Sequence, residues 1–181
     1  MLEITIPGRE FWDEKKEMFI TSKETTLKLE HSLVSLSKWE SKWHKPYFGK
    51  EKKTPEETLD YIRMMTLTQN VDPEVYHCMT PDIIDKIAKY IEDPMTATWF
   101  NEAGGPTNKK SEVVTAELIY YWMIAYQIPF ECQKWHINKL ITLIRVCNIK
   151  NQPDKKMSKR EVAKQQAAIN AARRKAHHSK G

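Results

Sequence analysis

The stretch that decides the fold is residues 25–36, Thr25-Thr26-Leu27-Lys28-Leu29-Glu30-His31-Ser32-Leu33-Val34-Ser35-Leu36. Its first six residues alternate between polar and apolar side chains, which is the period of a half-buried β-strand. Beyond Glu30 the period becomes helical, with matching positions at Leu33, Leu36, Trp39 or Glu40, and Trp43. Ser32 stands where a helix cap is expected, so the stretch predicts a strand followed directly by a helix that stops before Pro46.

The residues before this stretch favour further strands. Residues 2–6 alternate as Leu-Glu-Ile-Thr-Ile, and short apolar pieces follow at 11–12 and 18–20. The Pro7-Gly8 dipeptide is typical of a turn. We therefore expect a small antiparallel β-sheet within residues 1–30, with one of its turns at Pro7-Gly8.

The residues after this stretch favour helices. Thr54-Pro55-Glu56-Glu57 combines a cap residue, an early proline and acidic side chains, and Thr80-Pro81-Asp82 repeats the pattern. These signals predict helices running to about Gln69 and to Asp93-Pro94. Two further helices are expected over roughly 112–127 and 129–148, after a loop at 101–110.

The last part of the chain differs in composition. Residues 151–181 hold nine lysines and arginines against two acidic residues, whereas residues 1–150 hold 20 basic and 22 acidic residues. Ser158-Lys159-Arg160-Glu161 is a capping-box pattern that predicts a helix to about Lys175. The expected fold class is mainly α (α+β): a helical domain over 1–150 with its N-terminal sheet, then a basic helical or flexible arm over 151–181.

Compartment and chemistry are constrained by what the sequence lacks. Its three cysteines, Cys78, Cys132 and Cys147, are widely spaced and fit a reducing cytosol. We find no secretory signal, and the most apolar stretch, 118–128, is shorter than the roughly 20 residues of a membrane span. The sequence holds no nucleophile elbow, dinucleotide-binding or phosphate-loop motif, so we expect a soluble intracellular protein with no enzymatic activity and no cofactor.

The nearest approach to a metal site is Cys132 with His136, which would share a face of the expected 129–148 helix. His77-Cys78 would supply further ligands if the helices pack that way. Structural zinc sites usually show closely spaced cysteine pairs, so two buried thiols and two ordinary histidines are the preferred interpretation.

Aromatic residues are expected to build the core. Trp39 and Trp43 are four residues apart and would anchor a small core or form a stacking platform. Core positions are also expected for Tyr120, Tyr121, Trp122, Tyr126 and Trp135.

The arm carries the candidate partner-binding residues, which are basic side chains and a thin apolar stripe: Lys155, Lys156, Lys159, Arg160, Val162, Lys164, Ile169, Arg173, Arg174 and Lys175. Three interpretations remain open: a solvated helical face, a helix that packs on another protein's helix, and a phosphate-binding surface. No aromatic residue is interleaved with these charges, which lowers the expectation of single-stranded nucleic acid as the partner.

Four strings spread over most of the chain carry a resemblance to a known family: Leu29-Glu30-His31-Ser32-Leu33-Val34-Ser35-Leu36-Ser37-Lys38-Trp39-Glu40-Ser41-Lys42-Trp43 with Lys45-Pro46, Met95-Thr96-Ala97-Thr98, Ile128-Pro129-Phe130-Glu131-Cys132-Gln133-Lys134-Trp135-His136, and Met157-Ser158-Lys159-Arg160-Glu161. They resemble the tail assembly chaperones of long-tailed, siphovirus-type bacteriophages.

The resemblance implies a non-enzymatic protein of the host cell cytoplasm, absent from the mature virion. Such a chaperone binds the long, helical tape measure protein while the tail tube assembles around it, and the tail tube protein and self-association are further expected contacts. The family is commonly made in two lengths by ribosomal frameshifting. It offers no catalytic residue to carry over, and the alternative function is a nucleic-acid-binding phage protein that uses the basic arm.

Overall fold

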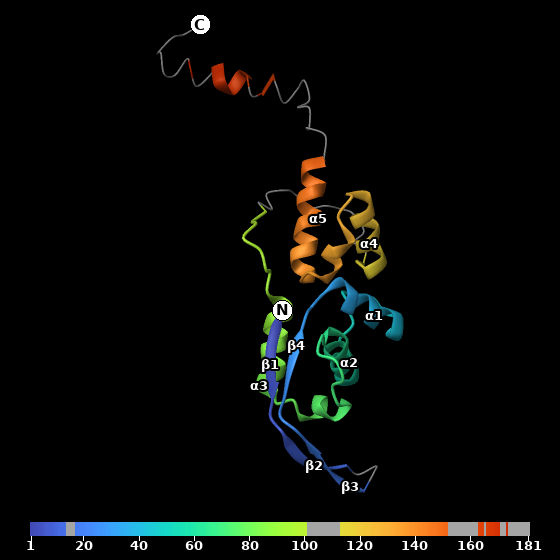
Figure 1. Cartoon of the computed structure of the whole chain (residues 1–181). Helices are drawn as coiled ribbons and strands as arrows, with labels where there is room; N and C mark the ends of the chain where they lie inside the picture. Colours follow the sequence, from blue (N-terminus) through green and yellow to red (C-terminus); the bar gives the residue numbers. More distant parts are fainter. Residues whose placement is uncertain (14–16, 101–112, 152–162, 165, 171–172, 174–181) are drawn as a thin grey trace. The chain divides into compact units, whose positions relative to one another are not determined.

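The computed structural model describes residues 1–13, 17–100, 113–151, 163–164, 166–170 and 173 (Figure 1). In chain order the elements, with η for short 3-10 helices, are β1 (Leu2–Ile6), β2 (Arg9–Asp13), β3 (Met18–Ser22), β4 (Thr25–Leu29), α1 (Leu33–Trp43), α2 (Pro55–Met65), η1 (Pro73–Cys78), α3 (Pro81–Glu92), α4 (Ala116–Ala125), η2 (Phe130–Lys134) and α5 (Ile137–Asn151). The predicted fold class is confirmed: the chain is mainly helical, with a small antiparallel sheet at its N-terminus.

The chain divides into two compact units, Met1–Cys147 and Asn148–Gly181. The first unit contains all the strands and the helices α1 to α4, together with most of α5. Among the helices of the described residues, none combines the length and the apolar character that crossing a membrane requires.

The four strands form two two-stranded antiparallel sheets that follow one another along a single ribbon. β1 pairs with β4 and β2 with β3, in a shared register that places Leu2 opposite Leu29 and Arg9 opposite Ser22. One face of the β1–β4 part is buried and the other is polar, because apolar and polar residues alternate along both strands. Figure 1 shows β2 and β3 at the end of the ribbon away from α4 and α5.

The predicted turn at Pro7-Gly8 is wrong. These residues lie between β1 and β2, which continue along the same ribbon, and the chain reverses between β2 and β3 instead. A Cβ atom on Gly8 would lie 2.8 Å from the carbonyl oxygen of Ser22 and 2.9 Å from the backbone nitrogen of Glu24. Glycine is therefore required here by the close approach of the two backbones, rather than by a reversal of the chain.

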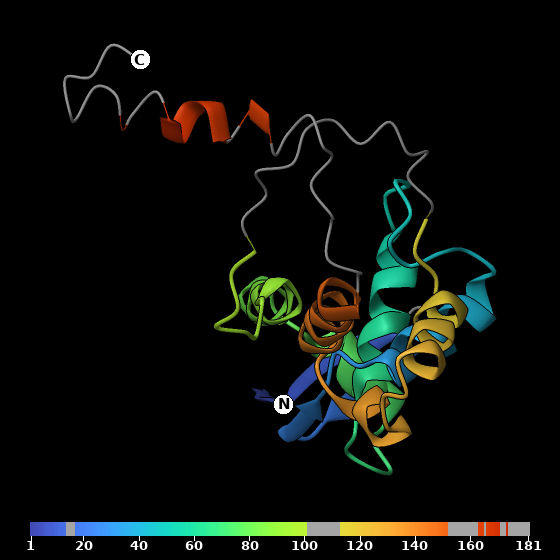
Figure 2. The ribbon, with the colours of Figure 1, turned by 90° about the horizontal axis from the view of Figure 1, so that it is seen from above.

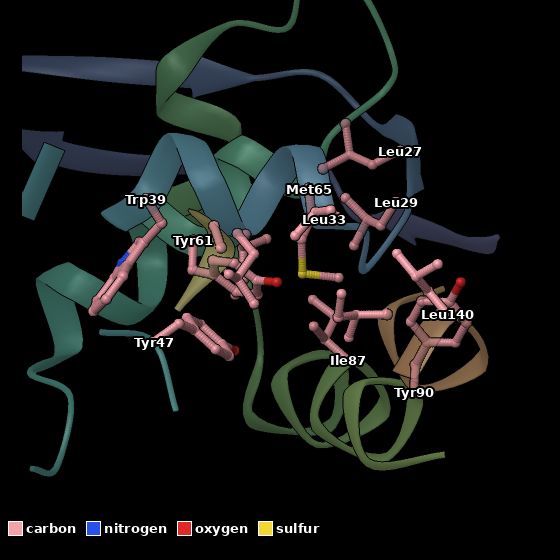
Figure 3. Close-up of a cluster of buried hydrophobic side chains, with 14 of the residues drawn as sticks. Leu27, Leu29, Leu33, Trp39, Tyr47, Tyr61, Met65, Ile87, Tyr90 and Leu140 are labelled. Atoms are coloured by element: carbon pink, nitrogen blue, oxygen red, sulfur yellow. The ribbon is translucent and has the colours of Figure 1, made fainter. Parts of the chain in front are cut away.

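The change from strand to helix occurs where the sequence predicts it. Ser32 caps α1, with its side chain accepting from the Ser35 backbone N–H while the Ser35 hydroxyl accepts from the Ser32 N–H. α1 ends at Trp43, before Pro46. The β1–β4 ribbon, α1, α2 and α3 then enclose a continuous apolar core, part of which Figure 3 shows.

The helix opened by Thr54-Pro55 begins as predicted but ends at Met65, four residues before the predicted Gln69. The reason is that the chain after α2 pairs with β4. Leu67 N–H donates to the carbonyl of Lys28 at 2.7 Å, and a bridge joins Leu29 to Thr66. A helix continued to residue 69 would lose these bonds to the strand.

α3 matches its prediction closely, ending before Asp93-Pro94, but the helix expected over 112–127 is shorter. It is α4, and it starts at Ala116 because Thr115 caps it.

The single helix expected over 129–148 is wrong, since η2 and α5 are separated at Trp135 and His136. There the chain turns extended, His136 bridges to Ser32, and Ile137 N–H donates to the His31 carbonyl at 2.7 Å. The expected loop at 101–110 lies outside the described residues.

Figure 2 views the chain from above, with the colours of Figure 1. α1 packs against α2, α4 and η2, whereas α3 packs against β1. α1 is therefore the element that connects the sheet-side core to the C-terminal helices of the first unit.

Candidate functional site

A buried polar centre lies where β4, α2, α3 and the start of α5 meet. His31 and His136 are both buried, and their rings are 5.0 Å apart at their centroids in an edge-to-face arrangement. Nδ1 of His31 lies 2.5 Å from the Tyr61 hydroxyl. His136 is fixed on both nitrogens: its Nδ1 accepts from the Asn138 N–H at 3.3 Å, and its Nε2 donates to the Tyr90 carbonyl at 3.0 Å. That pattern assigns His136 as the neutral ring protonated on Nε2.

The surroundings of these rings disfavour protonation. Burial is the main cause, followed by electrostatic interaction with His136 and Lys53, and together they lower the pKa of His31 from 6.5 to about 3. Burial also lowers the pKa of His136. Two neutral histidines that hold β4 against α2 and the start of α5 serve the fold, and they are poorly placed to exchange protons with a substrate.

The Cys132–His136 pair does not form the helical pair that the spacing predicted. Both residues are buried, but Cys132 lies in η2 while His136 follows it in extended backbone. His77 is exposed in η1, and Cys78 is buried there. Within the described ranges, no group of three or more histidine, cysteine, aspartate or glutamate residues is arranged to hold a metal ion.

A buried carboxylate, which sequence reasoning missed, joins three segments. Glu40 is 7% exposed, and its Oε1 accepts from the Tyr47 N–H while its Oε2 accepts from the Ala116 N–H, each at 2.7 Å. Burial raises the pKa of Glu40, although both hydrogen bonds act in the opposite direction. Glu40 thus ties α1 to the turn that follows it and to the first residue of α4. The feature of the sequence that could have revealed this role is an acidic residue on the apolar stripe of α1.

α4 exposes apolar side chains on the face turned away from α1. Tyr121 and Ile124 are each 63% exposed, and Leu118 and Trp122 are half-buried. We call these four residues the α4 face. The opposite side of the helix is the buried one, with Ala116, Ile119 and Met123. A helix that is apolar on nearly all sides is normally covered on all sides, whereas the described residues leave one side of α4 open.

The expectation that the aromatic residues of this region are core is wrong for Tyr121 and Trp135, which are exposed. Tyr120, Trp122 and Tyr126 are half-buried and pack against the core. The expectation for the α1 pair is confirmed at Trp39, which is 1% exposed and donates from Nε1 to the Glu57 carbonyl at 2.8 Å. The reason for the difference is that α1 is enclosed by α2, α4 and η2, whereas α4 has only one covered side.

The arm belongs to the second unit, Asn148–Gly181. Of its candidate residues, Lys164, Ile169 and Arg173 are described; they are helical and exposed. Lys155, Lys156, Lys159, Arg160, Val162, Arg174 and Lys175 lie outside the described residues, as does the capping-box pattern at 158–161. The three interpretations that the sequence leaves open for the arm, a solvated face, a helix that packs on another protein's helix and a phosphate-binding surface, therefore remain predictions.

Comparison of the chain with protein-family models, curated proteins and solved structures found no match.

Replacing Glu40 by glutamine tests its role in the fold. The amide has one acceptor oxygen, so either Tyr47 or Ala116 would face an N–H donor instead of a carboxylate oxygen. We expect the free energy of unfolding in urea to fall by about 1–3 kcal/mol. Glu56→Gln, at an exposed position of α2, is the matched control and should change stability by less than about 0.5 kcal/mol. Equal stability of the two variants would contradict the assignment.

The buried histidine predicts a pH dependence. Because the pKa of folded His31 lies below its unfolded value, neutral His31 stabilises the fold fully above pH 6.5, and this contribution is lost as the pH falls towards 3. The unfolding free energy should therefore fall less steeply over this window in His31→Gln than in the wild type. His77→Gln, at an exposed histidine, should follow the wild-type curve. Parallel curves for the wild type and His31→Gln would refute the prediction.

Proposed function

We propose that this chain is a non-enzymatic assembly factor that binds a helical structural protein, in the way that phage tail assembly chaperones bind the tape measure protein. The observation that carries the proposal is the α4 face, an open apolar surface on a helix whose other side is fully packed. The resemblance of four sequence strings to that family supplies the identity of the client.

The chemistry of the α4 face suits a helical client. Tyr121 and Trp122 offer large, rigid apolar surfaces with a polar tip, which are typical anchors of protein interfaces. Within α4 only Glu117 is charged; it is exposed on the same side of the helix as Tyr121 and Ile124, so the face carries one acidic side chain at its N-terminal end. A long helical protein with an apolar stripe would lie along α4 and be kept from associating with itself.

The buried titratable groups support a structural rather than a catalytic use. His31 is held by Tyr61, His136 by Tyr90 and Asn138, and Glu40 by two backbone N–H groups. These hydrogen bonds join elements of the fold to one another. The chain is proposed to act in the host cell cytoplasm and to be absent from the mature virion.

The arm would extend the contact with the client. Ile169 is exposed on a helical segment, and Lys164 and Arg173 flank it in sequence. Such a segment would pack its apolar side on a partner helix and pair its cations with acidic residues there. The tail tube protein and a second copy of the chain are further partners consistent with this arrangement.

The same exposed cations favour a second candidate, a nucleic-acid-binding protein that uses the arm. Its signature would be binding to DNA that weakens steeply with added salt and that disappears when residues 155–181 are deleted. DNA binding of this kind without any effect on the tape measure protein would favour this candidate over the chaperone.

Co-expression tests the proposal. The full chain should raise the soluble yield of the tape measure protein from the same phage and co-purify with it. The double variant Tyr121→Ser with Ile124→Ser should bind about tenfold more weakly, because it removes the two most exposed apolar side chains of the α4 face.

The matched control is Leu67→Ser with Ile84→Ser, which removes two exposed apolar side chains elsewhere on the first unit. This control should bind as the wild type does. Absence of any gain in soluble yield and of co-purification with the wild type would overturn the proposed function, whereas equal losses in the two double variants would overturn the role of the α4 face.

A further inference from the structure

A groove rich in lysine lies between the end of α1, the turn that follows it and the start of α2. Its volume is about 540 Å³. Four lysines line it against two glutamates, Glu51 and Glu57; the lysines are Lys45, Lys50, Lys52 and Lys53. We call it the lysine groove. It belongs entirely to the first unit, and the α4 face is not part of its lining.

One of the two glutamates already has a hydrogen-bond donor within the protein for each of its carboxylate oxygens. Glu57 is 3% exposed; its Oε1 accepts from Lys45 Nζ at 2.8 Å and its Oε2 accepts from the Thr54 N–H at 2.8 Å. Glu57 is therefore an internal anchor that orients Lys45 and caps α2. Glu57 is ion-paired with Lys45, and its charge also acts on Lys53, whose pKa it raises against the effect of burial.

Lys53 is the lysine held most firmly. Its Nζ donates to the Tyr47 carbonyl at 2.8 Å and lies 3.9 Å from the centroid of the Tyr47 ring and 5.6 Å from that of Trp39. Figure 3 shows Trp39 and Tyr47 together at one end of the buried cluster. Burial lowers the pKa of Lys53. Within the described part of the chain, no carboxylate lies within ion-pairing distance of Lys53 Nζ.

A half-buried ammonium that is fixed by a carbonyl and an aromatic face, and that forms no ion pair with the nearby Glu57, can still bind an external anion. Lys50 and Lys52 are exposed on the same short segment and have no ion-pair partner among the described residues. We propose that the lysine groove binds an acidic segment of a protein partner, with one carboxylate accepting from Lys53 Nζ and neighbouring carboxylates pairing with Lys50 and Lys52.

The lining favours an acidic peptide over a nucleic acid. The aromatic rings at the groove are buried, at 1% exposure for Trp39 and 8% for Tyr47, so they offer no face on which bases would stack. Pro46, Val113 and the edge of Trp39 add apolar lining that suits the methylene groups of a glutamate side chain.

This inference goes beyond the proposed function, because it assigns a second surface of opposite chemistry and holds whether or not the partner is a tape measure protein. The probe is an acetylated and amidated oligoglutamate peptide, titrated into the isotope-labelled full chain and followed by amide NMR. We expect saturable shifts at the backbone amides of residues 47–53, and weaker binding at higher salt.

Two sets of variants localise the binding. Lys53→Gln, which keeps a donor for the Tyr47 carbonyl, should weaken binding about tenfold. The double variant Lys50→Gln with Lys52→Gln changes only exposed positions, so it retains the fold and should also weaken binding severalfold. Lys38→Gln is the matched control; it removes one exposed positive charge from α1 outside the groove and should bind as the wild type does.

Three results would overturn the inference: no saturable shift with the wild type, equal losses in Lys53→Gln and Lys38→Gln, or tighter binding of duplex or single-stranded DNA at the same amides. Inorganic phosphate is the small-anion comparison, and binding of phosphate in preference to the peptide would also reject a peptide site. Because the titration contains no tape measure protein, its failure is distinguishable from failure of the proposed function.

Discussion

The carboxylate of Glu40 is the group on which the two surfaces proposed to bind partners depend. It is buried and accepts one backbone N–H from the turn after α1 and one from the first residue of α4. A buried carboxylate without such donors would be strongly destabilising, so its two bonds fix both segments relative to α1. The lysine groove lies beside the first of these segments, and the α4 face belongs to the second.

This arrangement places two unlike surfaces on one helical scaffold. The α4 face is apolar and open, and the lysine groove presents a fixed ammonium with two exposed neighbours. A helical client with an apolar stripe and acidic flanks would satisfy both kinds of surface. The buried histidines act elsewhere, holding β4 against α2 and the start of α5 as neutral rings.

The features that the sequence predicted well depend on neighbouring residues. Ser32 and the change of period at Glu30 locate the start of α1, and Asp93-Pro94 locates the end of α3. The predictions that are wrong concern features that depend on contacts between residues far apart in the sequence. α2 ends early because the chain after it pairs with β4, and the helix expected over 129–148 breaks where His136 bridges to Ser32. No local pattern encodes either contact.

The candidate site was harder to predict than the fold, for the same physical reason. Tyr121 looks like a core residue because its neighbours in the sequence are apolar, and only the three-dimensional packing reveals which side of α4 is left open. Glu40 lies on an apolar stripe, and its partners Tyr47 and Ala116 are brought to it by the fold. The candidate residues of the arm are predicted from its positive charge and its thin apolar stripe, and those that the structure describes are exposed helical positions.

The central claim is that the α4 face contacts a helical client, and site-specific photo-crosslinking tests it most directly. A photoreactive amino acid would replace Tyr121 in one variant and Leu67 in another, both at exposed apolar positions of the full chain. The account predicts that irradiation of cells expressing the tape measure protein links it to position 121 and not to position 67. Crosslinks from position 67 alone, or none from position 121 while the two proteins co-purify, would contradict it.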